Sequence, residues 1–193
     1  MLYCFFVFLL CALFAWLIYI WVKSAEYLWC CLVLHQIPFV PSSRFLRRAT
    51  VQAIKRFCPD VKTVCEIGSG YGGLARFVAR RCGADVVALE NMPFTNFVAR
   101  MGSFLPGGRR VQNIKADAFE YLKGKCGAFD VGVAYLGPVV NARLVDVMSC
   151  FNVLIVLDVP VPNVEPTAVM DVGRGFTRYG RLKFPHKLFI YKN

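Results

Sequence analysis

The chain has 193 residues, which suits one globular domain with a short appendage and excludes a second large domain. Apolar residues make up 57% of the chain and charged residues 18%, a composition that excludes intrinsic disorder. The formal net charge of +11 favours an anionic neighbour. Lipid headgroups, a nucleic acid and an acidic ligand all satisfy that requirement.

The N-terminal run from residue 1 to residue 22 contains no charged side chain and ends at Lys23. A helix of about 20 apolar residues crosses a hydrocarbon core of about 30 Å. We therefore expect residues 1–22 to form a single-pass transmembrane anchor. A cleaved signal peptide is the alternative, but the run is too long for one and lacks a basic n-region.

Basic side chains follow the expected anchor, at Lys23, Arg44, Arg47 and Arg48. By the positive-inside rule they place the rest of the chain on the cytoplasmic side of the membrane. The first 22 residues lack the Arg-rich pattern of a transit peptide. A bacterial inner membrane is therefore favoured, with the matrix side of the mitochondrial inner membrane as the alternative.

Residues 23–43 are expected to form a juxtamembrane linker. Within it, Tyr27–Val40 is apolar but too short to span a membrane alone, so it either prolongs the anchor helix or lies in the membrane interface. Pro38 and Pro41 end this stretch. The adjacent Cys30 and Cys31 are expected to pack near the membrane, with redox chemistry or lipidation as the alternative.

The nine cysteines include no C-x-x-C pair. The two histidines, His35 and His186, lie far apart in the sequence, so no metal site is expected. Both are expected to be structural or solvated. Several cysteines lie within apolar patterns, where cysteine acts as a small hydrophobic residue, and this favours a reducing compartment.

Residues 44–193 alternate between strand-like and helix-like patterns. The expected strands are residues 61–67, 84–90, 111–117, 129–136, 152–159, 169–176 and 188–192. The expected helices are residues 45–58, 72–81, 94–101, 118–123 and 140–150, the first of them with Phe45, Ala49, Ala53 and Phe57 on one face. Such alternation predicts an α/β domain with a mostly parallel sheet, and the last two strands predict an antiparallel finish.

A glycine-rich motif, E-I-G-S-G-Y-G-G at residues 66–73, follows one expected strand and opens the next helix. Glycines there permit a tight turn and a close approach of a ligand to the backbone. Glu90 ends the next strand, where a carboxylate binds both hydroxyls of a ribose. Asp117 ends the third strand, where it accepts a hydrogen bond from an adenine amino group or caps the next helix. Together with Glu66, these acids predict an adenosine-containing ligand.

A nicotinamide cofactor is one such ligand, because Gly68, Gly70 and Gly73 satisfy the pattern G-x-G-x-x-G. Two features oppose it. Glu66, immediately before the loop, would repel a pyrophosphate but attract a cationic amino-acid group. In addition, residues 61–193 are used by a single sheet, so no substrate domain remains for a dehydrogenase.

The glycine motif, the acidic ends of strands two and three and the count of seven strands resemble the class I S-adenosylmethionine-dependent methyltransferases. The resemblance covers roughly residues 44–193 and implies a Rossmann-like doubly wound sheet with S-adenosylmethionine as cofactor. The loop would line the methionine and the ribose, Glu90 would bind the ribose hydroxyls and Asp117 the adenine. The cofactor-binding residues implied are Glu66, Gly68, Ser69, Gly70, Gly72, Glu90, Asn91 and Asp117.

A narrower resemblance rests on the anchor, the P-F-V-P sequence at residues 38–41 and the E-N-M-P sequence at residues 90–93. These features are similar to the membrane-anchored lysine methyltransferases that include the modifier of the ATP synthase c-subunit, and to their bacterial relatives. The likeness implies that the acceptor is a lysine of a membrane protein. Those relatives commonly read D-x-G-S-G-D-G-R through the loop, whereas here Glu66, Tyr71 and Gly73 replace the two aspartates and the arginine. A changed substrate or lost activity is the alternative that these departures raise.

The acceptor is expected beside the loop after the fourth strand, which begins at Tyr135. Tyr135 is the candidate catalytic residue, because its hydroxyl can orient an incoming amine and favour the neutral form. A packed aromatic is its alternative role. The segment Asp158–Pro162, after the fifth strand, is a second candidate wall of the acceptor site.

Three functions remain open at this point. The first is methylation of a membrane protein, and the second is methylation of a lipid or quinone-like small molecule. The third is a non-catalytic cofactor-binding relative that serves as a membrane interaction module. The N/D-P-P-Y signature of many nucleobase methyltransferases is absent, which disfavours a nucleic-acid substrate despite the net charge.

Overall fold

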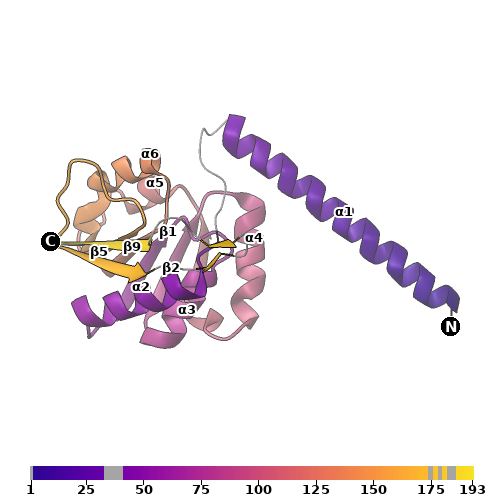
Figure 1. Cartoon of the computed structure of the whole chain (residues 1–193), viewed down its shortest axis with the longest axis horizontal. Coiled ribbons are helices and arrows are strands. Elements are labelled where there is room, and N and C mark those ends of the chain that lie inside the picture. Colours follow the sequence, from indigo (N-terminus) through magenta and orange to yellow (C-terminus); the bar gives the residue numbers. More distant parts are fainter. Residues whose placement is uncertain (1, 33–40, 174–175, 178–179, 182–185) are drawn as a thin grey trace. The chain divides into compact units, whose positions relative to one another are not determined.

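The computed structural model describes residues 2–32, 41–173, 176–177, 180–181 and 186–193, and the chain divides into two units, Met1–Pro38 and Phe39–Asn193. The first unit contains the helix α1 (Leu2–Leu32), drawn in indigo in Figure 1. Its segment Tyr3–Ala25 has a mean hydropathy of 2.6 and is long and apolar enough to cross a membrane. The helix continues beyond residue 22 into the expected linker. Residues 38–40 of the P-F-V-P sequence lie outside the described residues.

The second unit is built on a seven-stranded sheet with the strand order β3-β2-β1-β4-β5-β9-β6. Neighbours from β3 through β5 pair in parallel, whereas β9 runs antiparallel to both β5 and β6. The expectation of a doubly wound, mostly parallel sheet with an antiparallel last strand is confirmed. The strands are β1 (Thr63–Ile67), β2 (Asp85–Glu90), β3 (Val111–Lys115), β4 (Phe129–Ala134), β5 (Phe151–Leu157), β6 (Ala168–Gly173) and β9 (His186–Lys192).

A short pair of strands, β7 (Phe176–Thr177) and β8 (Gly180–Arg181), forms a separate antiparallel sheet between β6 and β9 in the chain. The sequence did not predict this hairpin, because its strands are too short for a period to be read. The expected strand 169–176 also crosses residues 174–175, which lie outside the described residues.

Helices cover both faces of the sheet, with α2 and α3 on one face and α5 and α6 on the other (Figure 1). One buried apolar cluster joins α2 and α3 to the strands, and a second lies on the opposite face with α5 and η3. The α-helices are α2 (Arg44–Phe57), α3 (Gly73–Cys82), α4 (Pro93–Met101), α5 (Ala118–Leu122) and α6 (Pro138–Asn141). The 3₁₀ helices are η1 (Gly102–Phe104), η2 (Gly108–Arg110) and η3 (Ala142–Cys150).

The expected face of α2 is confirmed at three of its four positions. Ala49 and Ala53 are buried, and Phe57 packs partly buried against the core, whereas Phe45 is 55% exposed. The buried face starts instead at Leu46 and continues at the i+3, i+4, i+7 and i+8 positions of an amphipathic helix.

The expected helix at residues 140–150 is instead the short α6 followed by the 3₁₀ helix η3. Its buried residues Asn141, Leu144, Val147 and Cys150 recur at every third position. That spacing matches the 3.0 residues per turn of a 3₁₀ helix, so the tighter winding keeps all four on one face.

The strand register brings the ends of five strands to one edge of the sheet. Ile67 of β1 is aligned with Leu89 of β2 and Ala134 of β4, and Leu157 of β5 is aligned with Leu188 of β9. The chain leaves β1 toward β2 and leaves β4 toward β5, so a switch point lies between β1 and β4. In α/β sheets, ligands bind at such a point beyond the carboxyl ends of the strands.

Candidate functional site

The glycine loop connects β1 to α3 at the switch point. Gly68, Gly70 and Gly72 have φ angles of 70°, 55° and 66°, in the left-handed region that favours glycine. A Cβ atom at Gly68 would lie 2.5 Å from Cδ2 of Leu136, the second residue after β4. The loop therefore packs directly on the segment that follows β4.

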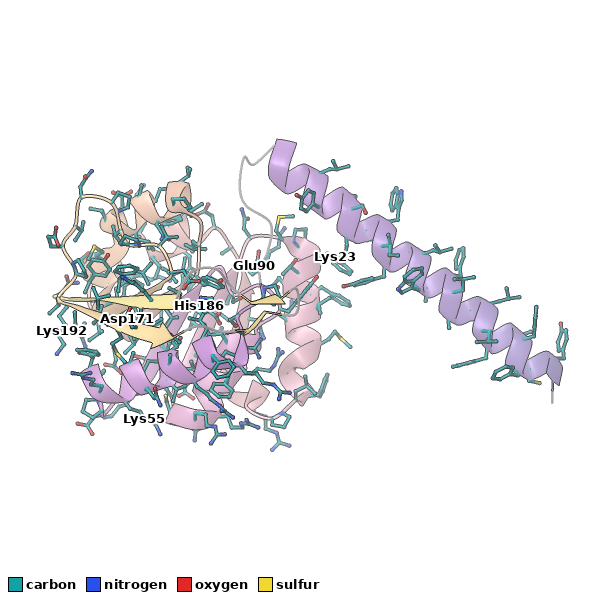
Figure 2. The ribbon with its side chains drawn as sticks, viewed as in Figure 1. Lys23, Lys55, Glu90, Asp171, His186 and Lys192 are labelled. Carbon is teal, nitrogen blue, oxygen red and sulfur yellow. The ribbon has the colours of Figure 1, made fainter. Side chains whose placement is uncertain are left out.

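Glu90, labelled in Figure 2, ties the glycine loop to the end of β2. Its side chain is 9% exposed. Oε2 accepts a hydrogen bond of 2.8 Å from the amide of Gly70, and Oε1 accepts one of 2.8 Å from the amide of Met92. Hydrogen bonds to an ionised group are stronger than neutral ones, so this carboxylate holds the loop in place.

Glu66, the acid before the loop, is 5% exposed. Burial raises its pKa to about 8, although the Ala75 amide and the charges of Arg47 and Arg76 act in the opposite direction. Its Oε2 atom has no hydrogen-bond partner among the described residues. Glu66 is therefore a buried carboxyl group with unused hydrogen-bonding capacity, and its burial favours the protonated form.

Two arginines pack against the end of the glycine loop. Nη1 of Arg76 donates a 2.9 Å hydrogen bond to the carbonyl of Tyr71. A Cβ atom at Gly73 would lie 2.7 Å from Nη2 of Arg47, whose Nε donates to Ser42 Oγ at 2.9 Å. The Arg47 guanidinium, which comes from α2, therefore lies close against the backbone at Gly73, and a larger residue there would displace it.

Asp117 caps α5. Its Oδ1 accepts hydrogen bonds from the amides of Phe119 and Glu120 at 2.9 and 3.2 Å. Its Oδ2 lies 3.8 Å from Nη1 of Arg143, whose guanidinium carbon is 4.0 Å from the centre of the Phe119 ring. The capping role left open by the sequence is present, and it fixes the Asp117 carboxylate at the end of β3.

The remaining expected cofactor-binding residues differ in exposure. Ser69 is 3% exposed, and its Oγ has no hydrogen-bond partner in the described part of the chain. Asn91 is exposed at the surface, directly after Glu90. Ser69 is therefore a second buried polar group beside the loop with unused capacity, whereas Asn91 is open to solvent.

A second group of polar side chains lies past β4, β5 and β9. Tyr135, the first residue after β4, is hydrogen-bonded to Asp158, the first residue after β5. Nδ1 of His186 lies 2.8 Å from both carboxylate oxygens of Asp158. Burial and the Asp158 carboxylate raise the pKa of Tyr135 above its ordinary value. We call Tyr135, Asp158 and His186 the Tyr-Asp-His cluster.

His186 is the residue that the sequence analysis missed. It is 8% exposed and paired with Asp158, so of the two expected roles the structural one is present and the solvated one is not. Its place at the start of an antiparallel last strand was the available signal, because the start of that strand meets the carboxyl end of β5. Glu66, the glycine loop and Glu90 thus surround one side of the switch point, and Tyr135 lies on the other side.

The described cysteines are free thiols, and no group of three His, Cys, Asp or Glu side chains in the described residues is placed to hold a metal ion. The side chains of Cys30 and Cys31 lie outside the described residues.

We predict a specific pH dependence of stability from Glu66. Its folded pKa of about 8 lies above the ordinary value of 4.5, so its contribution to stability is complete below pH 4.5 and is lost as pH rises through 8. Glu66→Gln removes the titration and keeps the shape. Thermal unfolding of both proteins is expected to show a Tm advantage of the variant that grows between about pH 5 and pH 8.5. A difference independent of pH would contradict the prediction.

No protein-family model matches this chain, and no curated protein matches it. Solved structures match it. An RNA methyltransferase from Salinibacter ruber, in complex with S-adenosyl-L-homocysteine, is 20% identical with a TM-score of 0.61, over 79% of this chain and 93% of that one. A precorrin-6y C5,15-methyltransferase from Geobacter metallireducens is 15% identical with a TM-score of 0.57, over 80% and 94%.

Cofactor-bound Rv0187 from MTB is 17% identical with a TM-score of 0.61, over 88% of this chain and 97% of that one. At these identities the likenesses establish the architecture. This chain has the Rossmann-like methyltransferase fold, with the seven-stranded sheet of the class I S-adenosylmethionine-dependent methyltransferases.

Proposed function

We propose that this protein is an S-adenosylmethionine-dependent methyltransferase held at a membrane by α1, and that its acceptor is a lysine amine of a membrane protein. The observation that carries the proposal is the joining of Glu90 to Gly70. This hydrogen bond places the carboxylate at the end of β2, where a ribose would be bound, next to the glycine loop with its positive φ angles. Both lie at the switch point of a methyltransferase fold.

The residues around the loop fit a cationic, adenosine-containing cofactor. Glu66 Oε2 and Ser69 Oγ are buried and lack partners among the described residues, so an ammonium donor would satisfy buried acceptors. A nearby cation also favours the ionised form of Glu66. Each carboxylate oxygen has two lone pairs, so Glu90 can hold the loop and still accept from ribose hydroxyls. The Salinibacter complex and cofactor-bound Rv0187 support this reading of the fold.

The cofactor, when bound, supplies an activated methyl group on a sulfonium. What the chain must add is position and a deprotonated acceptor. Leu136, the residue after Tyr135, packs on Gly68 of the glycine loop. We assign the Tyr135 hydroxyl to contact the incoming amine. Glu90 and Asp117 would fix the adenosine on the opposite side of the switch point.

Membrane attachment supports a membrane acceptor. The segment Tyr3–Ala25 is long and apolar enough to span a bilayer. A tether raises the local concentration of acceptors in the same membrane. The basic residues after the anchor favour the cytoplasmic side, in a bacterial inner membrane rather than on the matrix side of a mitochondrial one. The lysine acceptor rests on the resemblance to anchored lysine methyltransferases.

A lipid or quinone-like acceptor is the second candidate. Val139, in α6 just past Tyr135, is 79% exposed, and its apolar side chain would contact a lipophilic molecule that entered beside Tyr135.

We predict that the purified full chain binds S-adenosylmethionine and that Glu90→Ala weakens binding about 10- to 100-fold, because hydrogen bonds to a charged group are lost. Asp85→Ala, at the other end of β2, is the matched control and should bind as the natural protein does. Isothermal titration in detergent measures all three. Equal affinity of the Glu90 variant and the control would remove Glu90 from the cofactor site.

A second prediction locates the acceptor. Labelled S-adenosylmethionine and the protein are added to membranes that lack this protein, and protein, lipid and nucleic-acid fractions are counted separately. We expect label in one small membrane protein and no label with Gly70→Arg, in which a large side chain replaces a glycine at φ 55°.

Label in extracted lipid would replace the lysine acceptor with the lipophilic one, and label in nucleic acid would contradict both. Absence of label above the Gly70→Arg control, in a protein that binds the cofactor, would leave the non-catalytic membrane module.

A further inference from the structure

We propose that the Tyr-Asp-His cluster removes a proton from the acceptor amine, with Tyr135 touching the acceptor and Asp158 and His186 acting through Tyr135. The inference rests on the proposed function and extends it to Asp158 and His186, two residues that are not assigned to cofactor binding.

Position is the first argument. Ile67 of β1, Ala134 of β4 and Val156 of β5 are aligned side by side in the sheet. Gly68 and Tyr135 come directly after the first two, and Asp158 comes two residues after the third. The cluster therefore begins at the level of the sheet edge where the glycine loop begins. Cofactor-type residues occupy β1, β2 and β3, whereas the cluster occupies the ends of β4 and β5 and the start of β9.

Backbone strain is the second argument. Asp158 has a φ of 65°, and the amide of Val159 donates to the carbonyl of Leu157 at 2.8 Å, which closes a three-residue turn on Asp158. A turn of this kind with positive φ is rare and strained, and such strain gathers at functional sites. The Asp158 amide is also held by the Lys187 carbonyl at 2.8 Å, so β9 keeps the turn in place. The turn aims the carboxylate between Tyr135 and His186.

The hydrogen bonds of the cluster are the third argument. Because the Tyr135 hydroxyl donates to Asp158, its oxygen lone pairs remain available as acceptors on the other side. Asp158 in turn meets His186 at 2.8 Å, and His186 Nε2 is buried with no partner in the described part of the chain. A hydroxyl backed by a carboxylate and an imidazole can pass a proton inward.

The proton balance is simple. A lysine ammonium gives one proton to the Tyr135 oxygen while the Tyr135 proton moves to the Asp158–His186 pair. The neutral nitrogen then forms the new N–C bond, the C–S bond breaks, and its electron pair stays on sulfur. The pair returns its proton to solvent after product leaves. No oxidant, reductant or other co-reactant is needed.

Other charged groups lie near the cluster. Among the described residues, Asp158 is the charged group that acts on Tyr135. Lys187, next to His186 on β9, lies 4.0 Å from Asp171 on β6, and both of these side chains are exposed.

The test compares Tyr135→Phe, Asp158→Asn and His186→Asn in the full chain, with methyl transfer to membranes lacking the protein as the assay. Tyr191→Phe is the matched control, because it also removes a buried tyrosine hydroxyl. That hydroxyl accepts a hydrogen bond of 2.9 Å from the amide of Val161 and is not a member of the Tyr-Asp-His cluster. Tyr135→Phe is expected to lower kcat about 100-fold at about pH 7. The other two should lower it about 10-fold or more. The Kd for S-adenosylmethionine should stay within about threefold in every variant.

The pH profile separates proton removal from a structural role. A lysine amine has a pKa of about 10.4, so raising the pH to about 9.5 supplies more neutral acceptor without help. The ratio of the natural protein's kcat to that of each variant should therefore become smaller as pH rises. A deficit equal at all pH values, or a kcat like that of Tyr191→Phe, would overturn the inference. If the natural protein binds no S-adenosylmethionine, the proposed function itself fails, and that outcome is distinct.

Discussion

The register between β1 and β4 is the constraint on which the site depends. Parallel pairing of Ile67 with Ala134 and with Leu89 brings the ends of three strands to one level. Glu66, Glu90, Tyr135 and Asp158 all lie within a few residues of that level. A slip of one residue would turn each strand's side chains to the opposite face. The apolar clusters on both faces of the sheet oppose such a slip, so the cores of the domain also maintain the site.

The polar side chains on the two sides of the switch point differ in their hydrogen bonding. Around the glycine loop, buried acceptors at Glu66 and Ser69 are left without partners, which suits a cationic ligand that brings its own donors. Beyond β4, the polar groups are joined to one another in the order Tyr135, Asp158 and His186, and Nε2 of His186 is left without a partner among the described residues. A set of groups joined in this way is suited to moving a proton rather than to holding a charge. The proposed chemistry uses both properties.

Much of the fold could be predicted from the sequence because its elements are periodic and punctuated. The glycine loop, the strand ends at Glu90 and Asp117 and the antiparallel last strand all carry local signals. The failures have physical causes. Phe45 was expected on the buried face of α2 because it is aromatic, but it is largely exposed, and η3 winds more tightly than a run of hydrophobic residues indicates. The residues next to His186 do not indicate its partner, because Asp158 is 28 positions away and the two meet through the pairing of β5 with β9.

The central claim is that the cofactor lies over β1, β2 and β3 with its reactive end turned toward β4. An experimental structure of the full chain with S-adenosyl-L-homocysteine tests this most directly. The account predicts ribose hydroxyls at Glu90, the amino group near Glu66 and Ser69, and the sulfur on the side of Tyr135. A ligand bound elsewhere, or a sulfur facing away from Tyr135, would contradict it.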